Sequence, residues 1–154
     1  DENSELLASR QQAKVLIEAE KTFLSLGNLG WNVCILRFAE IYGPNRTLSE
    51  RVKKLKNQAL PGSGDHYTNM VHKDDCANAI DHALRHDFEG VFNLADDDHP
   101  TRRELYDAVA GKYGYPTVQW DPSMASLHNG NKRVSTHKIK AHGYSLKHPH
   151  RILD

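Results

Sequence analysis

The chain has 154 residues, of which 38% are hydrophobic, and its 20 Lys and Arg balance 20 Asp and Glu. This composition excludes an intrinsically disordered chain, and the zero net charge argues against a broadly basic surface for nucleic acid. No apolar run approaches the roughly 18 residues of a membrane-spanning helix, and residues 1–4 resemble neither a signal peptide nor a transit peptide.

The first helix is predicted over residues 9–26, where apolar side chains recur at helical spacing and glycines follow. The stripe consists of Leu16, Ala19, Phe23 and Leu26. Trp31–Phe38 is a near-continuous apolar run, which is typical of a strand buried on both faces of a parallel sheet.

A turn, a helix and a short strand are expected next. Tyr42–Asn45 has the composition of a turn. Thr47 and Glu50 have the spacing of a capping box, which predicts a basic helix from there to about Leu60. The strand is expected over Tyr67–His72.

The following helix is expected to begin with Asp74 as its cap. Its apolar face is predicted to hold Cys76, Ala77, Ile80, Ala83 and Leu84. Gly90–Ala95 has the character of a second buried strand.

The clearest local pattern in the chain is a second capping box, formed by Thr101 and Glu104. The apolar face of its helix carries Leu105, Val109 and Tyr113. A weak strand is expected over Thr117–Trp120, and Ser135 is expected to cap a short helix that ends before Gly143.

Alternating helices and buried strands predict an α/β fold with parallel strands. Cys34 and Cys76 both lie in apolar patterns, so we expect buried free thiols and a reducing compartment. That compartment would be the cytoplasm, or an organelle stroma if a targeting segment lies upstream.

Four segments carry recognisable motifs, and they follow one another over nearly the whole chain. They are Leu36–Arg46, Gly62–Gly64 with Asn69–Ala77, Gly90–Ala95, and Gly143–Tyr144 with Pro149. In this order they resemble the extended short-chain dehydrogenase/reductase family, the NAD-dependent epimerase/dehydratase group.

The resemblance implies that this is the C-terminal half of that fold. Residues 1–42 and 70–96 would be the C-terminal elements of a Rossmann-like parallel sheet, and residues 43–69 and 97–154 a small α/β substrate-binding lobe. The family's glycine-rich turn for the cofactor pyrophosphate has no match in this sequence. The N-terminal half of the fold is therefore an expected partner.

The family's Tyr-x-x-x-Lys pair should lie on the first helix, but the first 41 residues contain no tyrosine. Placing Lys14 on the family's lysine puts Arg10 at the tyrosine position, and arginine does not shuttle protons near neutral pH. Placing Glu20 on the family's downstream glutamate instead puts Gln12 and Leu16 on the pair. Lys14 is the candidate catalytic residue of the first alignment.

The other candidate site residues come from the resemblance by position. Phe38 and Ile41 would contact the cofactor, NAD or NADP, whereas Glu40, Tyr42 and Arg46 would face the substrate. Glu40 stands where the family often has Asn or Gly, a departure from the usual sugar-binding pattern.

Thr68, Asn69 and His72 would also lie on the substrate side. The family often has an arginine near Thr68 that grips a diphosphate, and threonine cannot do this. His72 with Asp74 and Asp75 is interpreted as a strand end followed by helix caps, so no metal site is expected.

The resemblance implies an NAD(P)-dependent oxidoreductase that acts on a sugar-like or nucleotide-linked substrate. The alternative is a non-catalytic cofactor-binding or RNA-binding protein on the same scaffold, with the basic helix after Arg51 as its contact surface. A homodimer through the first helix is also implied, while nucleic acid is the less expected partner and a membrane is not expected.

Overall fold

The computed structural model describes residues 1–6, 11–55, 58–124 and 130–154. Its strands form three parallel pairs, which confirms the predicted α/β class with parallel strands. The pairs are β1 (Cys34–Phe38) with β5 (Gly90–Leu94), β2 (Glu40–Tyr42) with β4 (Met70–His72), and β3 (Ala59–Pro61) with β6 (Gln119–Asp121).

The first two pairs follow one another along the same stretch of backbone. Beyond the end of β1, the amide of Ala39 donates to the Leu94 carbonyl at 2.9 Å. The next amide, that of Glu40, donates to the Asn69 carbonyl at 3.1 Å. The chain therefore leaves β5 and joins β4 within two residues.

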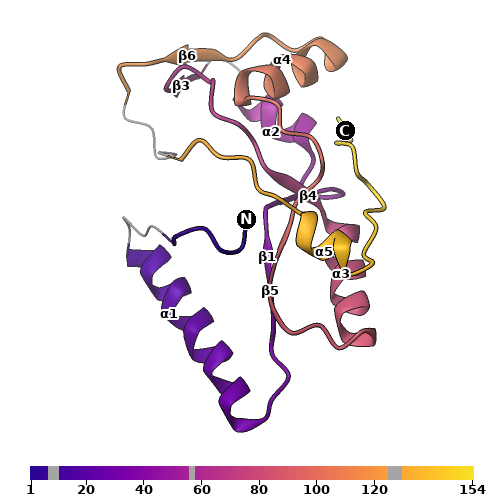
Figure 1. The fold of residues 1–154 in the computed structure, drawn as a ribbon. Coiled ribbons are helices and arrows are strands. Elements are labelled where there is room, and N and C mark those ends of the chain that lie inside the picture. Colours follow the sequence, from indigo (N-terminus) through magenta and orange to yellow (C-terminus); the bar gives the residue numbers. More distant parts are fainter. Residues whose placement is uncertain (7–10, 56–57, 125–129) are drawn as a thin grey trace.

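Five α-helices and one 3₁₀-helix are present among the described residues. They are α1 (Gln11–Ser25), η1 (Leu26–Leu29), α2 (Leu48–Lys54), α3 (Lys73–Arg85), α4 (Arg102–Tyr113) and α5 (His137–Ala141). In Figure 1, α2, α4, β3 and β6 gather at one end of the molecule, and α1, α3 and α5 surround β1 and β5 at the other. None of the helices in the described part of the chain is long and apolar enough to cross a bilayer.

The core consists of two clusters, and β2 with β4 separates them. Successive strand residues point to opposite faces. Met70 accordingly packs with Tyr42 in the cluster that α2 and α4 cover, whereas Val71 and the half-buried Ile41 pack in the cluster beneath α3. The short helix α5 joins this second cluster through Ile139.

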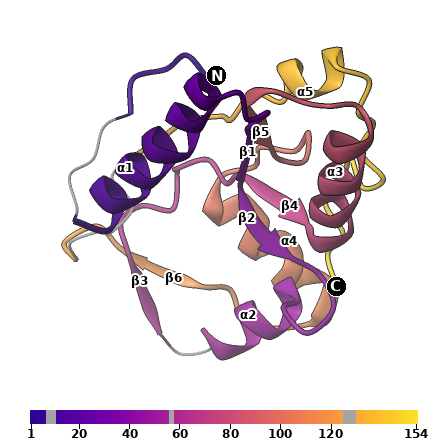
Figure 2. The same cartoon turned by 90° about the horizontal axis from the view of Figure 1, so that it is seen from below.

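The expectation that Trp31–Phe38 is a strand buried on both faces is wrong. The strand begins only at Cys34, and every residue of β1 is half-buried. Among the described strands only β5 pairs with β1, so its other edge is open. Helices α1 and α3 stand on opposite sides of β1 (Figure 2), and an apolar groove of about 720 Å³ runs between them.

This apolar groove is lined mainly by hydrophobic side chains: Phe23, Leu26, Trp31, Val33, Cys34, Leu36, Phe38, Ile80, Ala83, Leu84 and Phe88. Helix α1 contributes no buried residue to the fold, and Leu16 of its predicted stripe is 71% exposed. The start of that predicted helix, residues 9–10, lies outside the described residues. An ion pair between Glu20 and Arg37 joins the helix to β1.

Two predicted helices differ from the observed ones. Helix α2 is capped by Thr47 as expected but ends at Lys54, because Ala59–Pro61 pairs with β6 instead of extending the helix. Helix α3 is capped by His72 rather than Asp74, since the Nδ1 atom of His72 accepts from the Asp74 amide at 3.2 Å.

The predicted apolar faces of α3 and α4 are partly exposed. On α3, Cys76 and Ala83 are buried, whereas Ile80 and Leu84 are exposed and line the apolar groove. On α4, Leu105 and Val109 are buried as expected, but Tyr113 is exposed. Both cysteines are free; Cys76 is buried and Cys34 is only half-buried.

The smaller predicted elements are displaced by a few residues. Tyr42 ends β2, and the turn follows it with Asn45 in the left-handed region at φ 70°. The weak strand is Gln119–Asp121. Helix α5 begins after Thr136, although the Ser135 hydroxyl accepts from the first helical amide at 3.3 Å.

The capping box of α4 is confirmed, and its loss has a predictable cost. The Thr101 hydroxyl accepts from the Glu104 amide at 3.2 Å, and the Glu104 carboxylate accepts from the Thr101 amide at 2.7 Å. We expect Thr101→Ala to lower the free energy of unfolding of the protein by about 1 kcal/mol in urea denaturation. Thr117→Ala, at an exposed position outside any helix, is the matched control. Equal losses in both variants would contradict the prediction.

Candidate functional site

A polar cavity of about 260 Å³ lies where β1 and β5 end and β2 and β4 begin. Most of its lining is charged or able to form hydrogen bonds. The residues are Glu40, Arg51, His66, Tyr67, Thr68, Asn69, Arg102, Leu105, Tyr106, Gly130 and Lys132. In open parallel sheets, the space beyond the carboxyl ends of the strands is where ligands bind.

The polar cavity has an excess of positive charge. Arg51, Arg102 and Lys132 contribute three cations against the carboxylate of Glu40. Arg51 forms an ion pair with Glu40, so one cation is already partly neutralised. The guanidinium of Arg102 lies 5.1 Å from the ring centroid of Trp120, an arrangement that holds a cation in place without cancelling its charge.

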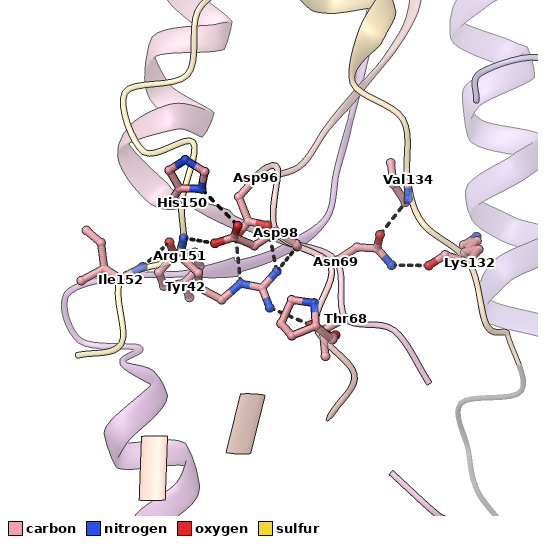
Figure 3. Close-up of polar contacts among 11 residues, drawn as sticks. Tyr42, Thr68, Asn69, Asp96, Asp98, Lys132, Val134, His150, Arg151 and Ile152 are labelled. Carbon is pink, nitrogen blue, oxygen red and sulfur yellow. Dashed lines mark hydrogen bonds and ion pairs between the residues drawn. The ribbon is translucent and has the colours of Figure 1, made fainter. Parts of the chain in front are cut away.

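Two hydrogen bonds from Asn69 join the loop before β4 to the segment after residue 130. Its side-chain nitrogen donates to the Lys132 carbonyl at 2.9 Å, and its oxygen accepts from the Val134 amide at 2.7 Å (Figure 3). Tyr67 is joined to the same segment, since the Arg133 guanidinium donates to its hydroxyl at 2.7 Å. These contacts give the cavity a wall from two distant parts of the chain.

The floor behind Thr68 is built by Arg151 from the C-terminal tail. The Arg151 side chain is 2% exposed and donates two bonds of 2.8 Å to the two carboxylate oxygens of Asp96. It also donates to the Thr68 hydroxyl at 2.6 Å and to the Asp98 carbonyl at 2.7 Å (Figure 3). Burial raises the pKa of Asp96, and the bonds from Arg151 oppose that shift.

The structure brings only part of the predicted substrate side together. Glu40, Thr68 and Asn69 line the polar cavity. Tyr42 lies instead in the core, where burial raises the pKa of its phenol and the hydroxyl accepts from the Ile152 amide at 3.1 Å. Arg46 is exposed on the turn after β2 and does not line the cavity.

His72 is also outside the polar cavity. Its ring is buried against the Tyr42 ring, with centroids 5.3 Å apart, and against the His148 ring at 4.0 Å. Burial lowers the pKa of His72, and the neighbouring His148 adds to the effect.

The predicted cofactor-side residues differ in their surroundings. Phe38 lines the groove, and Ile41 is half-buried in the second core cluster. Lys14 is exposed on α1, and Arg10 lies outside the described residues. Glu20, on which the second alignment of the first helix depends, forms an ion pair with Arg37 of β1. The hydrogen bond from Arg37 lowers the pKa of the Glu20 carboxyl group.

Several cavity residues could not be found from the sequence. Arg51, Arg102 and Lys132 belong to α2, α4 and the segment before α5, and no local motif joins them. The basic run that begins at Arg51 is the nearest hint in the sequence, and it points to a helix surface and not to this cavity.

Parallel strands that alternate with helices, with a polar cavity near the strand ends, define an open-sheet type of α/β protein. The profile of the NAD dependent epimerase/dehydratase family matches residues 13–95. The chain belongs to this family. No curated protein sequence matches this chain significantly.

Solved structures share this fold. A conserved protein of unknown function from Silicibacter pomeroyi has a TM-score of 0.81 at 23% identity, over 97% of this chain and 56% of its own. A dTDP-glucose 4,6-dehydratase from Bacillus anthracis, solved with NAD, has a TM-score of 0.79 at 18% identity, over 96% of this chain and 50% of its own. A UDP-N-acetylglucosamine 4-epimerase from Methanobrevibacter ruminantium, solved with UDP-N-acetylmuramic acid, has a TM-score of 0.79 at 14% identity, over 96% of this chain and 51% of its own. The chain thus spans about half the length of these structures.

Proposed function

We propose that this chain forms the substrate-binding side of an NAD(P)-dependent oxidoreductase of the epimerase/dehydratase family. The polar cavity with its three cations carries the proposal, because a guanidinium and an ammonium suit the oxygens of a diphosphate. The substrate would then be nucleotide-linked, with the sugar-like part directed toward Glu40 and Asn69.

The chain's own residues fit only the edge of a cofactor site. Phe38 and Ile41 offer apolar surface, but the sequence has no glycine-rich turn that would receive a pyrophosphate. When bound, the dinucleotide supplies the hydride chemistry. We assign its main binding site to the N-terminal half that the family resemblance implies, because this chain spans only about half the length of the solved structures that share its fold.

The N-terminal half is also the occupant we propose for the apolar groove. The open edge of β1 has unpaired backbone groups, which another parallel strand would satisfy. Phe23 on α1 and Leu84 on α3 are both exposed at its sides, where such a half would cover them.

A homodimer through α1 is a separate proposal. Val15 and Leu16 are exposed on this helix, and a second copy of it would bury them. Sedimentation of the full-length protein should give twice the mass of one chain. A clean monomer at micromolar concentration would contradict the dimer, but it would not contradict the proposed substrate site.

The proposed substrate class leads to a quantitative expectation for the cations. A hydrogen bond to a charged group contributes about 1.5–3 kcal/mol. We therefore expect Lys132→Gln to weaken the binding of a dTDP- or UDP-sugar to the full-length protein by about tenfold or more, measured by calorimetry. Lys53→Gln, at an exposed position of α2 outside the cavity, is the matched control and should bind normally. Equal affinities for both variants would contradict an anionic ligand in the cavity.

One observation favours a non-catalytic member of the family as the second candidate. The first 41 residues contain no tyrosine, and Lys14 is exposed on α1. Nicotinamide fluorescence of the full-length protein separates the two candidates. Binding of the dinucleotide with turnover of a nucleotide sugar supports the oxidoreductase, and binding without turnover supports the second candidate. If RNA is its ligand, the affinity should fall steeply between about 50 and 200 mM salt.

A further inference from the structure

A cluster of two histidines and one aspartate lies where β4 meets α3, outside the polar cavity. His72 ends β4, Asp74 stands in the first turn of α3, and His148 comes from the C-terminal tail. Within the described residues, one possible donor atom of each lies within 4.8 Å of the other two. The fold thus gathers three metal-ligating side chains that the sequence spreads over more than seventy positions.

The distances within this cluster are close to those of a metal site. The His148 Nε2 atom lies 3.5 Å from an Asp74 carboxylate oxygen, and the His72 Nδ1 atom lies 3.9 Å from the same oxygen. Ligands around a tetrahedral zinc ion are about 3.3 Å apart, as zinc–nitrogen bonds of about 2.0–2.1 Å require. Both distances are longer than this spacing, so the three side chains must move inward when an ion binds.

The Nε2 atom of His148 has only a long polar contact at this place. The atom is buried and makes no hydrogen bond of good geometry, because its neighbour, an Asp74 carboxylate oxygen, lies 3.5 Å away. A buried polar atom that is poorly paired carries an energetic penalty, which a coordinated ion would remove. The His72 side chain is only 6% exposed, so the site has one well-shielded wall.

We propose that His72, Asp74 and His148 bind a divalent transition-metal ion, with zinc as the best match. Two neutral imidazoles and one carboxylate suit zinc better than the harder magnesium or calcium, and water would complete the tetrahedron. The ion clamps the C-terminal tail onto the start of α3. Arg151 and Ile152, which hold Thr68 and Tyr42, follow a few residues later on the same tail.

Two hydrogen bonds at the cluster must break when the ion binds. The Lys147 ammonium donates to the same Asp74 oxygen at 2.9 Å, and its exposed side chain can turn into solvent. The Asp74 amide gives up its bond to His72 Nδ1. Asp75 keeps the tail in place meanwhile, because its carboxylate accepts from the amides of Lys147 and His148 at 2.6 and 3.0 Å.

Titration with Co²⁺ and Zn²⁺ tests the site in the full-length protein, purified without a polyhistidine tag. We expect one tight site per chain, with the strong visible absorption of tetrahedral Co²⁺ and displacement by Zn²⁺. His148→Gln or Asp74→Asn should weaken binding by at least about tenfold, since even the loss of an outer-shell partner costs metal sites 10–100-fold.

Two further variants distinguish the loss of a metal ligand from general damage to the fold. His150→Gln removes an exposed histidine two positions along the tail, which contacts Asp98 instead, and should bind metal normally. Lys147→Gln removes the competing ammonium and should tighten binding, an effect that misfolding does not produce. The proposal is overturned if the protein binds no metal tightly, or if His148→Gln and His150→Gln bind it equally well.

Discussion

Replacement of Arg151 by leucine should destabilise the full-length protein by about 3–5 kcal/mol, because it leaves the Asp96 carboxylate buried without its partner. Asp96 is 1% exposed, and Arg151 donates to both of its carboxylate oxygens. Burial raises the pKa of Asp96, so part of the cost can be relieved by protonation. Denaturation in urea at neutral pH measures the loss.

The control for this prediction is the same substitution at an exposed pair. Arg85 also bonds a carboxylate, that of Asp81 at 2.7 Å, but both side chains are mostly exposed. Solvent screens such a pair, so Arg85→Leu should leave the stability nearly unchanged. A double variant with Asp96→Leu and Arg151→Leu should be more stable than Arg151→Leu alone, because no buried charge remains. Equal losses for Arg151→Leu and Arg85→Leu would show that the buried pair contributes nothing.

The same residue connects stability to the candidate site. Arg151 donates to the Thr68 hydroxyl, and Thr68 also donates through its amide to the Pro100 carbonyl at 2.9 Å. Loss of the guanidinium removes the first of these two hydrogen bonds to Thr68. A conservative Arg151→Lys change keeps the charge but loses the paired geometry, so it should show an intermediate stability.

The parts of the fold that depend on near neighbours in the sequence could be predicted. The Thr101–Glu104 capping box closes within four residues, and it lies in the structure as the spacing indicates. The strand Gly90–Leu94 and the parallel class follow from apolar runs and their alternation with helices. Local hydrogen bonds and periodicity are sufficient for these features.

Features that depend on distant partners could not be predicted. Trp31–Phe38 has the composition of a fully buried strand, but burial is set by neighbours, and β1 has only one among the described strands. Helix α2 stops before Leu60 because that residue pairs with Trp120 in β6. A sequence pattern carries no information about a pairing partner sixty positions away.

The candidate site shows the same division. Glu40, Thr68 and Asn69 come from segments that resemble the family, and all three line the polar cavity, although their role toward a substrate stays a prediction. Arg102 and Lys132 stand in no motif. Tyr42 was expected to face the substrate, but the tail residue Ile152 occupies its hydroxyl from 110 positions away.

The apolar groove leads to the second large effect, an expected instability of the 154-residue chain by itself. An exposed apolar surface of this kind in a monomer favours association or covering by a partner. We expect the chain alone to melt without a cooperative transition, and a longer form that carries the proposed N-terminal half to melt cooperatively. A sharp cooperative melt of the dilute chain alone would contradict the proposed role of the N-terminal half.

Cys34 offers a direct measure of whether the groove is covered. It lines the groove and is half-buried, whereas Cys76 is buried and its pKa is raised to about 11, chiefly by burial. A thiol reagent should therefore modify Cys34 first in the 154-residue chain, since the thiolate is the reactive form. In the full-length protein we expect its rate to fall by about tenfold or more, because reaction then requires the groove to open. A Cys34→Ser variant assigns the remaining signal to Cys76, and equal Cys34 rates in both proteins would mean that nothing covers the open edge of β1.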